Sequence, residues 1–352
     1  MSTFNLDALL RDNIKRLAPY SSARNEFKGS ASVYLDANEN PYGSPLMQKY
    51  NRYPDPLQMQ LKEKLSHIKG VPVDHTFIGN GSDEVIDLLI RAFCRPQLDH
   101  IMILPPTYGM YEVSAAINDV GVKRVPLTPD YQLDLDGIAE QIDAHTKLIF
   151  VCSPNNPTGN SMHREDIETL LTNFHGLVVI DEAYINFSRK QSFIQELTEY
   201  DNLLVMQTLS KAWGLAALRI GMAFSSRGVI EVLNKIKPPY NINQASLDLA
   251  LEALDEVQQV NAWIQETVQY RARLSRDLTR FPFVTRVYPS DANFLLVQVN
   301  NADVLYRYLM EESIIVRNRS KVLLCENCLR ITIGTPEENA QIIQALEKYQ
   351  DA

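Results

Sequence analysis

The chain has 352 residues, of which 45% are apolar, so it can bury a large core in two domains or in one elaborate domain. Asp and Glu outnumber Lys and Arg by 43 to 34, the formal net charge is -9, and no basic block stands out, which argues against a nucleic-acid partner and favours small molecules. No segment has the apolar length needed to cross a bilayer, and four cysteines are too few for a disulfide scaffold, so we expect a cytoplasmic protein.

Short apolar runs alternate with helical patterns over residues 60–235. Five of these runs are apolar throughout rather than alternating, and they cover residues 76–79, 101–104, 148–152, 177–180 and 203–206. Runs of this kind are typical of strands that are buried on both faces. Between them, segments such as "DEVIDLLIRAF" carry apolar residues at helical spacing. The order predicts βαβ units, and hence an α/β fold with a mostly parallel central sheet.

The character of the sequence changes after Pro238 and Pro239. A long helical pattern over residues 245–280 leads to two strand-like segments, "ANFLLVQV" and "CLRITIG", with helical patterns around them. This order is typical of a smaller α+β domain. We therefore expect a large domain over residues 41–245. The second domain would combine residues 246–352 with the N-terminal arm, residues 1–40.

Polar motifs follow the five predicted strands. Ligands of open parallel sheets bind beyond the carboxyl ends of the strands, so these motifs are candidates for a site. "NGSDE" after the first run is a glycine turn that opens a helix, whose free N–H groups suit a phosphate. The next three runs lead to Tyr108 in "PPTYG", to the stiff loop "SPNNPTG" and to Asp181 in "DEAY". The last leads to "QTLSKAWGLAALRIG", which contains Lys211 and Arg219.

Each of these residues, taken singly, has a simpler explanation. Asp181 could cap a helix, Tyr108 could belong to the core, and Lys211 could be a solvated amine. Together, however, a lysine, an acid, an arginine and a phosphate-ready helix start fall at one edge of the sheet. Pyridoxal 5'-phosphate needs this set, because it takes a lysine for its Schiff base, an acid at its pyridine nitrogen and a cradle for its phosphate. The sequence therefore predicts a site for this cofactor.

Seven motifs in order resemble those of the fold-type I aminotransferases, which depend on pyridoxal 5'-phosphate. They are "NRYPDP", "GNGSDE", "PPTYGMY", "CSPNNPTG", "DEAYI", "TLSKAWGLAALRIG" and "CLRITIGT". The chain is most similar to the class II members that act on histidinol phosphate. The resemblance implies a homodimer that moves the amino group of L-histidinol phosphate to 2-oxoglutarate. The products would be imidazole acetol phosphate and L-glutamate, in histidine biosynthesis.

The same resemblance implies roles for individual residues. Lys211 would bind the cofactor and move the proton, and Asp181 would keep the pyridine nitrogen protonated. Tyr184 and Asn156 would hydrogen-bond the phenolic oxygen, while Tyr108 would stack on the ring. The phosphate would be held by Ser82, Asp83, Thr208, Ser210, Arg219 and, from the neighbouring subunit, Tyr53.

Four further residues are candidates for substrate binding. Arg330 in "CLRITIG" matches the family arginine that holds an anionic group, and Arg317 in "IIVRNRSK" offers a second cation for a phosphate. A solvated surface position for Arg317 stays open. Tyr20 and Asn241 lie where the family contacts substrate, although a structural role suits either as well. We expect no metal site, because the one CxxC, "CENC", has no second pair of ligands.

Three alternatives to this function remain. An aromatic amino acid aminotransferase would share every cofactor motif, and a phosphothreonine decarboxylase would share the fold and a phosphate-bearing substrate. A nucleotide-binding α/β module without this cofactor is disfavoured, because "GNGSDE" lacks the GxGxxG spacing.

Overall fold

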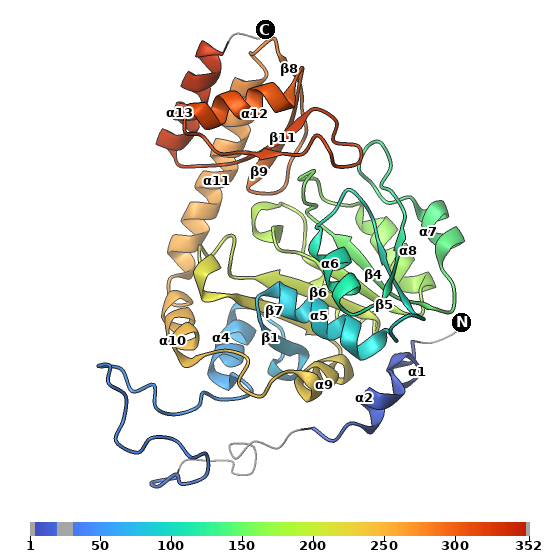
Figure 1. The fold of residues 1–352 in the computed structure, drawn as a ribbon, viewed down its shortest axis with the longest axis vertical. Helices are drawn as coiled ribbons and strands as arrows, with labels where there is room; N and C mark the ends of the chain where they lie inside the picture. The colour runs from blue at the N-terminus through green and yellow to red at the C-terminus, as the bar shows by residue number, and fades with distance from the viewer. Residues whose placement is uncertain (1–3, 20–30, 350–352) are drawn as a thin grey trace.

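The computed structural model describes residues 4–19 and 31–349, which build two sheets with helices packed around them (Figure 1). The larger sheet has seven strands in the order β1-β7-β6-β5-β4-β2-β3. They are β1 (Thr76–Asn80), β2 (His100–Ile103), β3 (Gly121–Arg124), β4 (Thr146–Cys152), β5 (Leu177–Asp181), β6 (Leu203–Thr208) and β7 (Ile220–Ser225). β7 is antiparallel to both of its neighbours, and the remaining pairings are parallel.

The five apolar runs predicted as strands are β1, β2, β4, β5 and β6, which confirms the mostly parallel sheet. The sequence did not predict β3 or β7. β3 lies at the sheet edge, where its residues are partly exposed and include Lys123 and Arg124, so no apolar run marks it. β7 is fully buried but follows Arg219 directly, and its first residues belong to a motif that we interpreted as a loop.

Helices cover both faces of the larger sheet, which explains why its central strands are apolar throughout. Along β4, Leu148 and Phe150 pack on one face, and Ile149 and Val151 pack on the other. The first face is covered by α5 (Ser82–Phe93), α6 (Met110–Ile117) and α9 (Arg227–Ile236). The second is covered by α4 (Met59–Lys69), α7 (Leu135–Gln141), α8 (Arg164–Asn173) and α10 (Gln244–Ala253).

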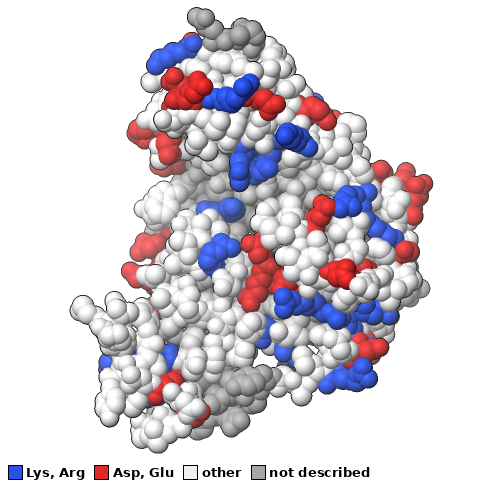
Figure 2. All heavy atoms as spheres, viewed as in Figure 1, with Lys and Arg blue, Asp and Glu red and all other residues white. Residues whose placement is uncertain are grey.

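The smaller sheet is antiparallel, in the order β10-β11-β9-β8. Its strands are β8 (Val284–Val287), β9 (Phe294–Val299), β10 (Arg317–Asn318) and β11 (Cys328–Thr332). One face packs against α11 (Val257–Leu278), α12 (Ala302–Glu311) and α13 (Pro336–Lys348). The other face meets the larger part of the molecule, where Leu296 joins the core under the larger sheet. Figure 2 shows Lys and Arg side chains gathered on both sides of this junction.

Two details of the smaller part and of the N-terminal arm differ from expectation. The helix predicted over residues 245–280 is two helices, α10 and α11, because the chain turns after Ala253. The arm begins with α1 (Leu6–Leu9) and α2 (Asp12–Arg16), which pack on the larger part rather than the smaller one. Leu9 and Ile14 insert into the core beside α5 and α9, and Lys235 Nζ donates to the Ile14 carbonyl at 2.7 Å. The domain boundaries themselves stay a prediction.

Residues 31–58 run along the lower edge of the molecule in Figure 1 without forming a helix or strand. This segment exposes several large apolar side chains, namely Val33, Leu35, Tyr42, Leu46, Met47 and Tyr53. Among the described helices, none combines the length and the apolar character needed to span a bilayer.

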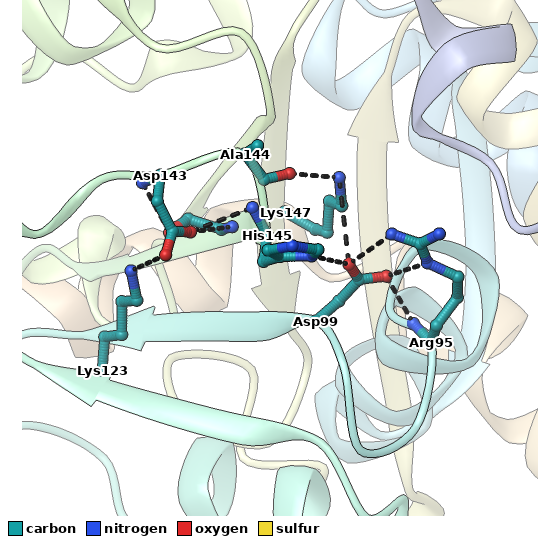
Figure 3. Close-up of polar contacts among 8 residues, drawn as sticks. Arg95, Asp99, Lys123, Asp143, Ala144, His145 and Lys147 are labelled. Carbon is teal, nitrogen blue, oxygen red and sulfur yellow. Dashed lines mark hydrogen bonds and ion pairs between the residues drawn. The ribbon is translucent and has the colours of Figure 1, made fainter.

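An ionic cluster closes the amino-terminal edge of the larger sheet (Figure 3). Asp99, just before β2, is 1% exposed and accepts hydrogen bonds from Arg95 Nε at 2.8 Å and Nη2 at 2.9 Å. His145 Nδ1 lies 3.2 Å and Lys147 Nζ 3.9 Å from the same carboxylate. Burial alone would raise the pKa of Asp99, but the Arg95 and His145 contacts lower it to about 2. The cluster stabilises the amino-terminal edge of the sheet, and the candidate site lies at the opposite, carboxyl edge.

Candidate active site

A cavity of about 530 Å³ opens at the carboxyl edge of the larger sheet, beneath the smaller one. Loops that follow β1, β2, β4, β5 and β6 form its lower wall, and β10, β11 and the loop between them form its upper wall. Twelve residues predicted from the sequence line it together. They are Ser82, Asp83, Tyr108, Asn156, Asp181, Tyr184, Thr208, Ser210, Lys211, Arg219, Arg317 and Arg330.

Asp181 ends β5 and is only 4% exposed. Its Oδ2 accepts a hydrogen bond from the Tyr111 hydroxyl at 2.7 Å, and its Oδ1 accepts one from the Ala183 N–H at 3.1 Å. Burial raises the pKa of the Asp181 carboxyl, and these two donors offset part of the effect. A buried acid in this state favours a cationic partner in the cavity.

Tyr111 is a residue that the sequence reasoning missed. It lies in α6, is fully buried, and its ring stacks on Phe150 with 4.6 Å between centroids. The motif "PPTYGMY" contained the signal, because Tyr111 puts a hydroxyl on the buried side of a helix and a buried hydroxyl needs a partner. The motif could not show that the partner is Asp181.

Lys211 follows β6 and is exposed at the cavity surface. Desolvation by the surrounding protein lowers the pKa of its amine, and the charge of Arg330 lowers it further, whereas Asp181 acts in the opposite direction. The Lys211 Nζ lies 5.6 Å from the centroid of the Tyr184 ring, which in turn packs edge-on against Phe294. An amine with a lowered pKa is more often neutral, and only the neutral form acts as a nucleophile or a base.

A tight crossing of two chain segments forms the start of α5. Gly81 has a φ of 75° and its N–H donates to the Arg219 carbonyl at 2.7 Å. A Cβ on Gly221 would lie 2.4 Å from the Ser82 nitrogen, so only glycine permits this approach. The free N–H groups of the first helical turn thus lie beside the Arg219 side chain, whose Nη2 is 3.5 Å from Asp83 Oδ2. This arrangement suits a phosphate.

The loop after β4 is fastened to the loop after β2. The Asn155 amide donates to the Pro106 carbonyl at 2.8 Å and to Thr158 Oγ1 at 2.7 Å. The peptide bonds before Pro154 and Pro157 are cis. Asn156 is 9% exposed and its Oδ1 accepts a hydrogen bond from Arg330 Nη1. The loop therefore holds Asn156 between the lower and the upper wall of the cavity.

Strand alternation directs Arg330 into the cavity. Its neighbours in β11, Leu329 and Ile331, pack into the core of the smaller part, so Arg330 points to the other face. Arg317 is its partner across β10 and β11, and Arg319 lines the same wall. Burial lowers the pKa of Arg330, and the charge of Arg319 adds to this effect. A wall of guanidinium groups is suited to an anionic ligand.

The chain matches the family model of class I and II aminotransferases over residues 25–346. The protein belongs to the class I and II aminotransferase family. It is 53% identical to the histidinol-phosphate aminotransferase of Cytophaga hutchinsonii over 346 residues, which are 98% of this chain and 99% of the relative.

Two solved structures share the fold of this aminotransferase. The histidinol-phosphate aminotransferase from Sinorhizobium meliloti, in complex with pyridoxal-5'-phosphate, has a TM-score of 0.78 at 23% identity and covers 88% of each chain. The L-threonine-O-3-phosphate decarboxylase from Porphyromonas gingivalis has a TM-score of 0.72 at 23% identity and covers 85% of this chain and 90% of its own. Proteins named as an aminotransferase and as a decarboxylase therefore share this fold.

Two of the described site residues predicted for the aminotransferase, Tyr53 and Asn241, are not among those that line the cavity. Tyr20 lies outside the described residues. Tyr53 is 51% exposed and stacks on Tyr240, with 4.5 Å between ring centroids.

Asn241 uses its amide within the protein. Its Nδ2 donates to the Ile78 carbonyl at 3.0 Å and to Glu84 Oε2 at 2.8 Å, and its Oδ1 accepts from Gln58 Nε2 at 3.2 Å and from Lys237 Nζ at 3.1 Å. This geometry fits the structural role that the sequence left open. A role for Asn241 in substrate binding stays a prediction.

Proposed function

We propose that this aminotransferase uses pyridoxal 5'-phosphate to transfer the amino group of L-histidinol phosphate to 2-oxoglutarate, as a step of histidine biosynthesis. The observation that carries the proposal is a cavity in which Lys211 and a buried Asp181 face the guanidinium groups of Arg317, Arg319 and Arg330. The lysine and the acid match the cofactor, and the arginines match a phosphate-bearing substrate. The name of the relative at 53% identity supports the same substrate.

The residues present fit the cofactor. Asp181 would take the pyridinium nitrogen as the cationic partner that its burial favours. Ser82, Asp83, Thr208, Ser210 and Arg219 would surround the cofactor phosphate. When bound, the cofactor supplies an electron sink for the negative charge that develops at the substrate Cα.

The side chains on either side of the ring would set its position and chemistry. Tyr108 would lie against one face of the ring, and Tyr184 and Asn156 would donate hydrogen bonds to the phenolic oxygen. Lys211 would hold the cofactor covalently until substrate displaces it, and its amine would then accept the proton from the substrate Cα. The lowered pKa of Lys211 supports this base role, because it increases the neutral fraction of the amine.

Arg330 and Arg317 would hold the anionic end of each substrate in turn. One guanidinium fork accommodates a carboxylate of glutamate, whereas a phosphate can accept from two forks at once. An aromatic amino acid offers no phosphate to this wall. The cationic wall therefore supports histidinol phosphate over the aromatic alternative.

Absorbance spectra of the purified protein test this function. We expect the band of the bound aldehyde form of the cofactor to convert to that of the amine form on addition of L-histidinol phosphate, and 2-oxoglutarate to reverse the change. Conversion by phenylalanine but not by histidinol phosphate would favour the aromatic alternative. Release of carbon dioxide from phosphothreonine without need for 2-oxoglutarate would favour the decarboxylase, and a colourless protein would contradict the cofactor.

We also propose a homodimer in which Tyr53 reaches the cofactor phosphate of the neighbouring subunit. Two observations support it. Residues 31–58 carry large apolar side chains that the rest of the subunit leaves exposed, such as Tyr42 and Met47 at 98% each. A second copy of the chain would bury them. Tyr53 belongs to the same segment and faces away from its own cavity. We also propose a cytoplasmic location, because the four cysteines are free thiols, as is usual in a reducing compartment.

A further inference from the structure

Arg319 lies two residues beyond Arg317, where β10 ends, and lines the cavity. Its N–H donates to the Cys328 carbonyl at 2.8 Å, which continues the ladder between β10 and β11. Residues two apart along such a ladder share a face, so Arg319 lies on the same side as Arg317 and its cross-strand partner Arg330. Arg319 is partly buried, whereas Arg317 is exposed.

The Arg319 guanidinium lacks the partners that a buried cation normally has. Its Nε is buried and makes no hydrogen bond, and the same holds for Arg330 Nε. Within residues 4–19 and 31–349, no Asp or Glu forms an ion pair with either side chain. Burial lowers the pKa of Arg319, and the charge of Arg317 adds to the effect. Like charges placed together without an acid destabilise the free protein, and a bound anion would offset this cost.

The charge of the anion decides how many arginines are useful. A carboxylate has one negative charge and two oxygens, which a single guanidinium fork satisfies. A phosphate monoester carries about 1.5 to 2 negative charges near neutral pH and has three acceptor oxygens. A partly buried guanidinium is less screened by solvent than an exposed one, so Arg319 should respond to the additional charge more strongly than Arg317.

We propose that Arg319 is the specificity-determining residue that selects a doubly charged phosphate over a singly charged carboxylate. The inference rests on the function proposed above and deepens it. Arg330 and Arg317 hold the anionic end of either substrate, and Arg319 adds a further cation that only the phosphate uses.

The test compares Arg319→Gln and Arg319→Lys with a matched control, Lys321→Gln. Lys321 is an exposed cation of the same loop that does not line the cavity. We would measure kcat/KM with L-histidinol phosphate and with L-glutamate, and inhibition of the glutamate reaction by inorganic phosphate. Arg319→Gln should lower kcat/KM for histidinol phosphate by about 10- to 100-fold and that for glutamate by less than about threefold.

Inorganic phosphate should inhibit Arg319→Gln about 10- to 100-fold more weakly than it inhibits the wild-type enzyme. The loss of inhibition should be intermediate in Arg319→Lys, and Lys321→Gln should be inhibited as strongly as the wild type. Equal losses with both substrates, or unchanged inhibition by inorganic phosphate, would overturn the inference. If the wild-type enzyme does not use histidinol phosphate, the proposed function fails, while the inhibition constants for phosphate still decide the role of Arg319. Thermal denaturation checks folding, and Arg319→Lys carries the test if Arg319→Gln does not fold.

Discussion

The hydrogen bond from Tyr111 to Asp181 permits a sharp test of the electrostatics of the site. Tyr111→Phe removes one hydroxyl that donates to a buried carboxylate at 2.7 Å, and keeps the ring that stacks on Phe150. A hydrogen bond to a charged group contributes about 1.5 to 3 kcal/mol. The substitution should therefore raise the pKa of Asp181 further.

The effect on stability should depend on pH. Burial already raises the pKa of Asp181 above its unfolded value, so ionising this carboxyl destabilises the folded apoprotein. Stability from this group is present below the unfolded pKa of about 3.9 and is lost as the pH rises through the folded pKa. Tyr111 reduces that loss, because its hydroxyl stabilises the ionised form. Tyr111→Phe should consequently cost most where Asp181 is ionised and little where it is protonated.

Tyr131→Phe is the matched control. Tyr131 is also buried, and its hydroxyl donates to the neutral Leu324 carbonyl at 2.7 Å. Chemical denaturation of both variants at several pH values should give a pH-dependent cost for Tyr111→Phe and a constant cost of about 1 kcal/mol for Tyr131→Phe. Equal and constant costs in both variants would refute the argument that Tyr111 acts on the charge of Asp181.

Four further predictions concern the active site, the subunit interface and the remote ionic cluster. Lys211→Ala should abolish transamination, and borohydride reduction of the wild-type holoenzyme followed by peptide mapping should label Lys211; a label on another lysine would contradict its role. Asp181→Asn should keep the fold but cripple turnover, whereas near-normal kcat would make Asp181 a mere cap. Tyr53→Phe should weaken cofactor binding by roughly 1 kcal/mol. Mixing this variant with Lys211→Ala should yield hybrids with at most one intact site, and activity equal to unmixed controls despite subunit exchange would argue against sharing. Asp99→Asn should lower the unfolding free energy by about 1 to 2 kcal/mol above the unfolded pKa of about 3.9, because the pKa of Asp99 is lowered to about 2 and its contribution is lost as the pH falls through that value. Denaturation across pH checks this, and a cost that persists unchanged in acid would contradict it.

The sequence predicted those parts of the molecule that depend on neighbouring residues along the chain. A strand such as β5 is buried on both faces, so its residues are all apolar and its end is marked by Asp181. Asn156 and Lys211 follow their strands by only a few residues, so the sheet edge positions them. β3 was missed because partial exposure removes the apolar signal.

Contacts between distant parts of the chain left no such signal. Tyr111 meets Asp181 across 70 residues, and only the packing of α6 on the sheet brings them together. The position of Arg319 depends on β10, a strand of two residues whose register is set by its partner β11. For Tyr53, the single chain gives a position outside the cavity, so the role proposed for it would need a second chain.

The charges of the cavity connect substrate binding to the proton transfer. Arg330 is the largest charged influence that lowers the pKa of Lys211, and Asp181 acts against it. An anion that binds Arg330 neutralises part of this positive field, and so raises the pKa of the Lys211 amine. A higher pKa leaves less of the amine neutral, so the bound anion opposes the lowering of the pKa that makes Lys211 available as a base. A doubly charged phosphate neutralises more of the field than a carboxylate, so the pKa of Lys211 should rise more with the phosphate-bearing substrate than with the carboxylate.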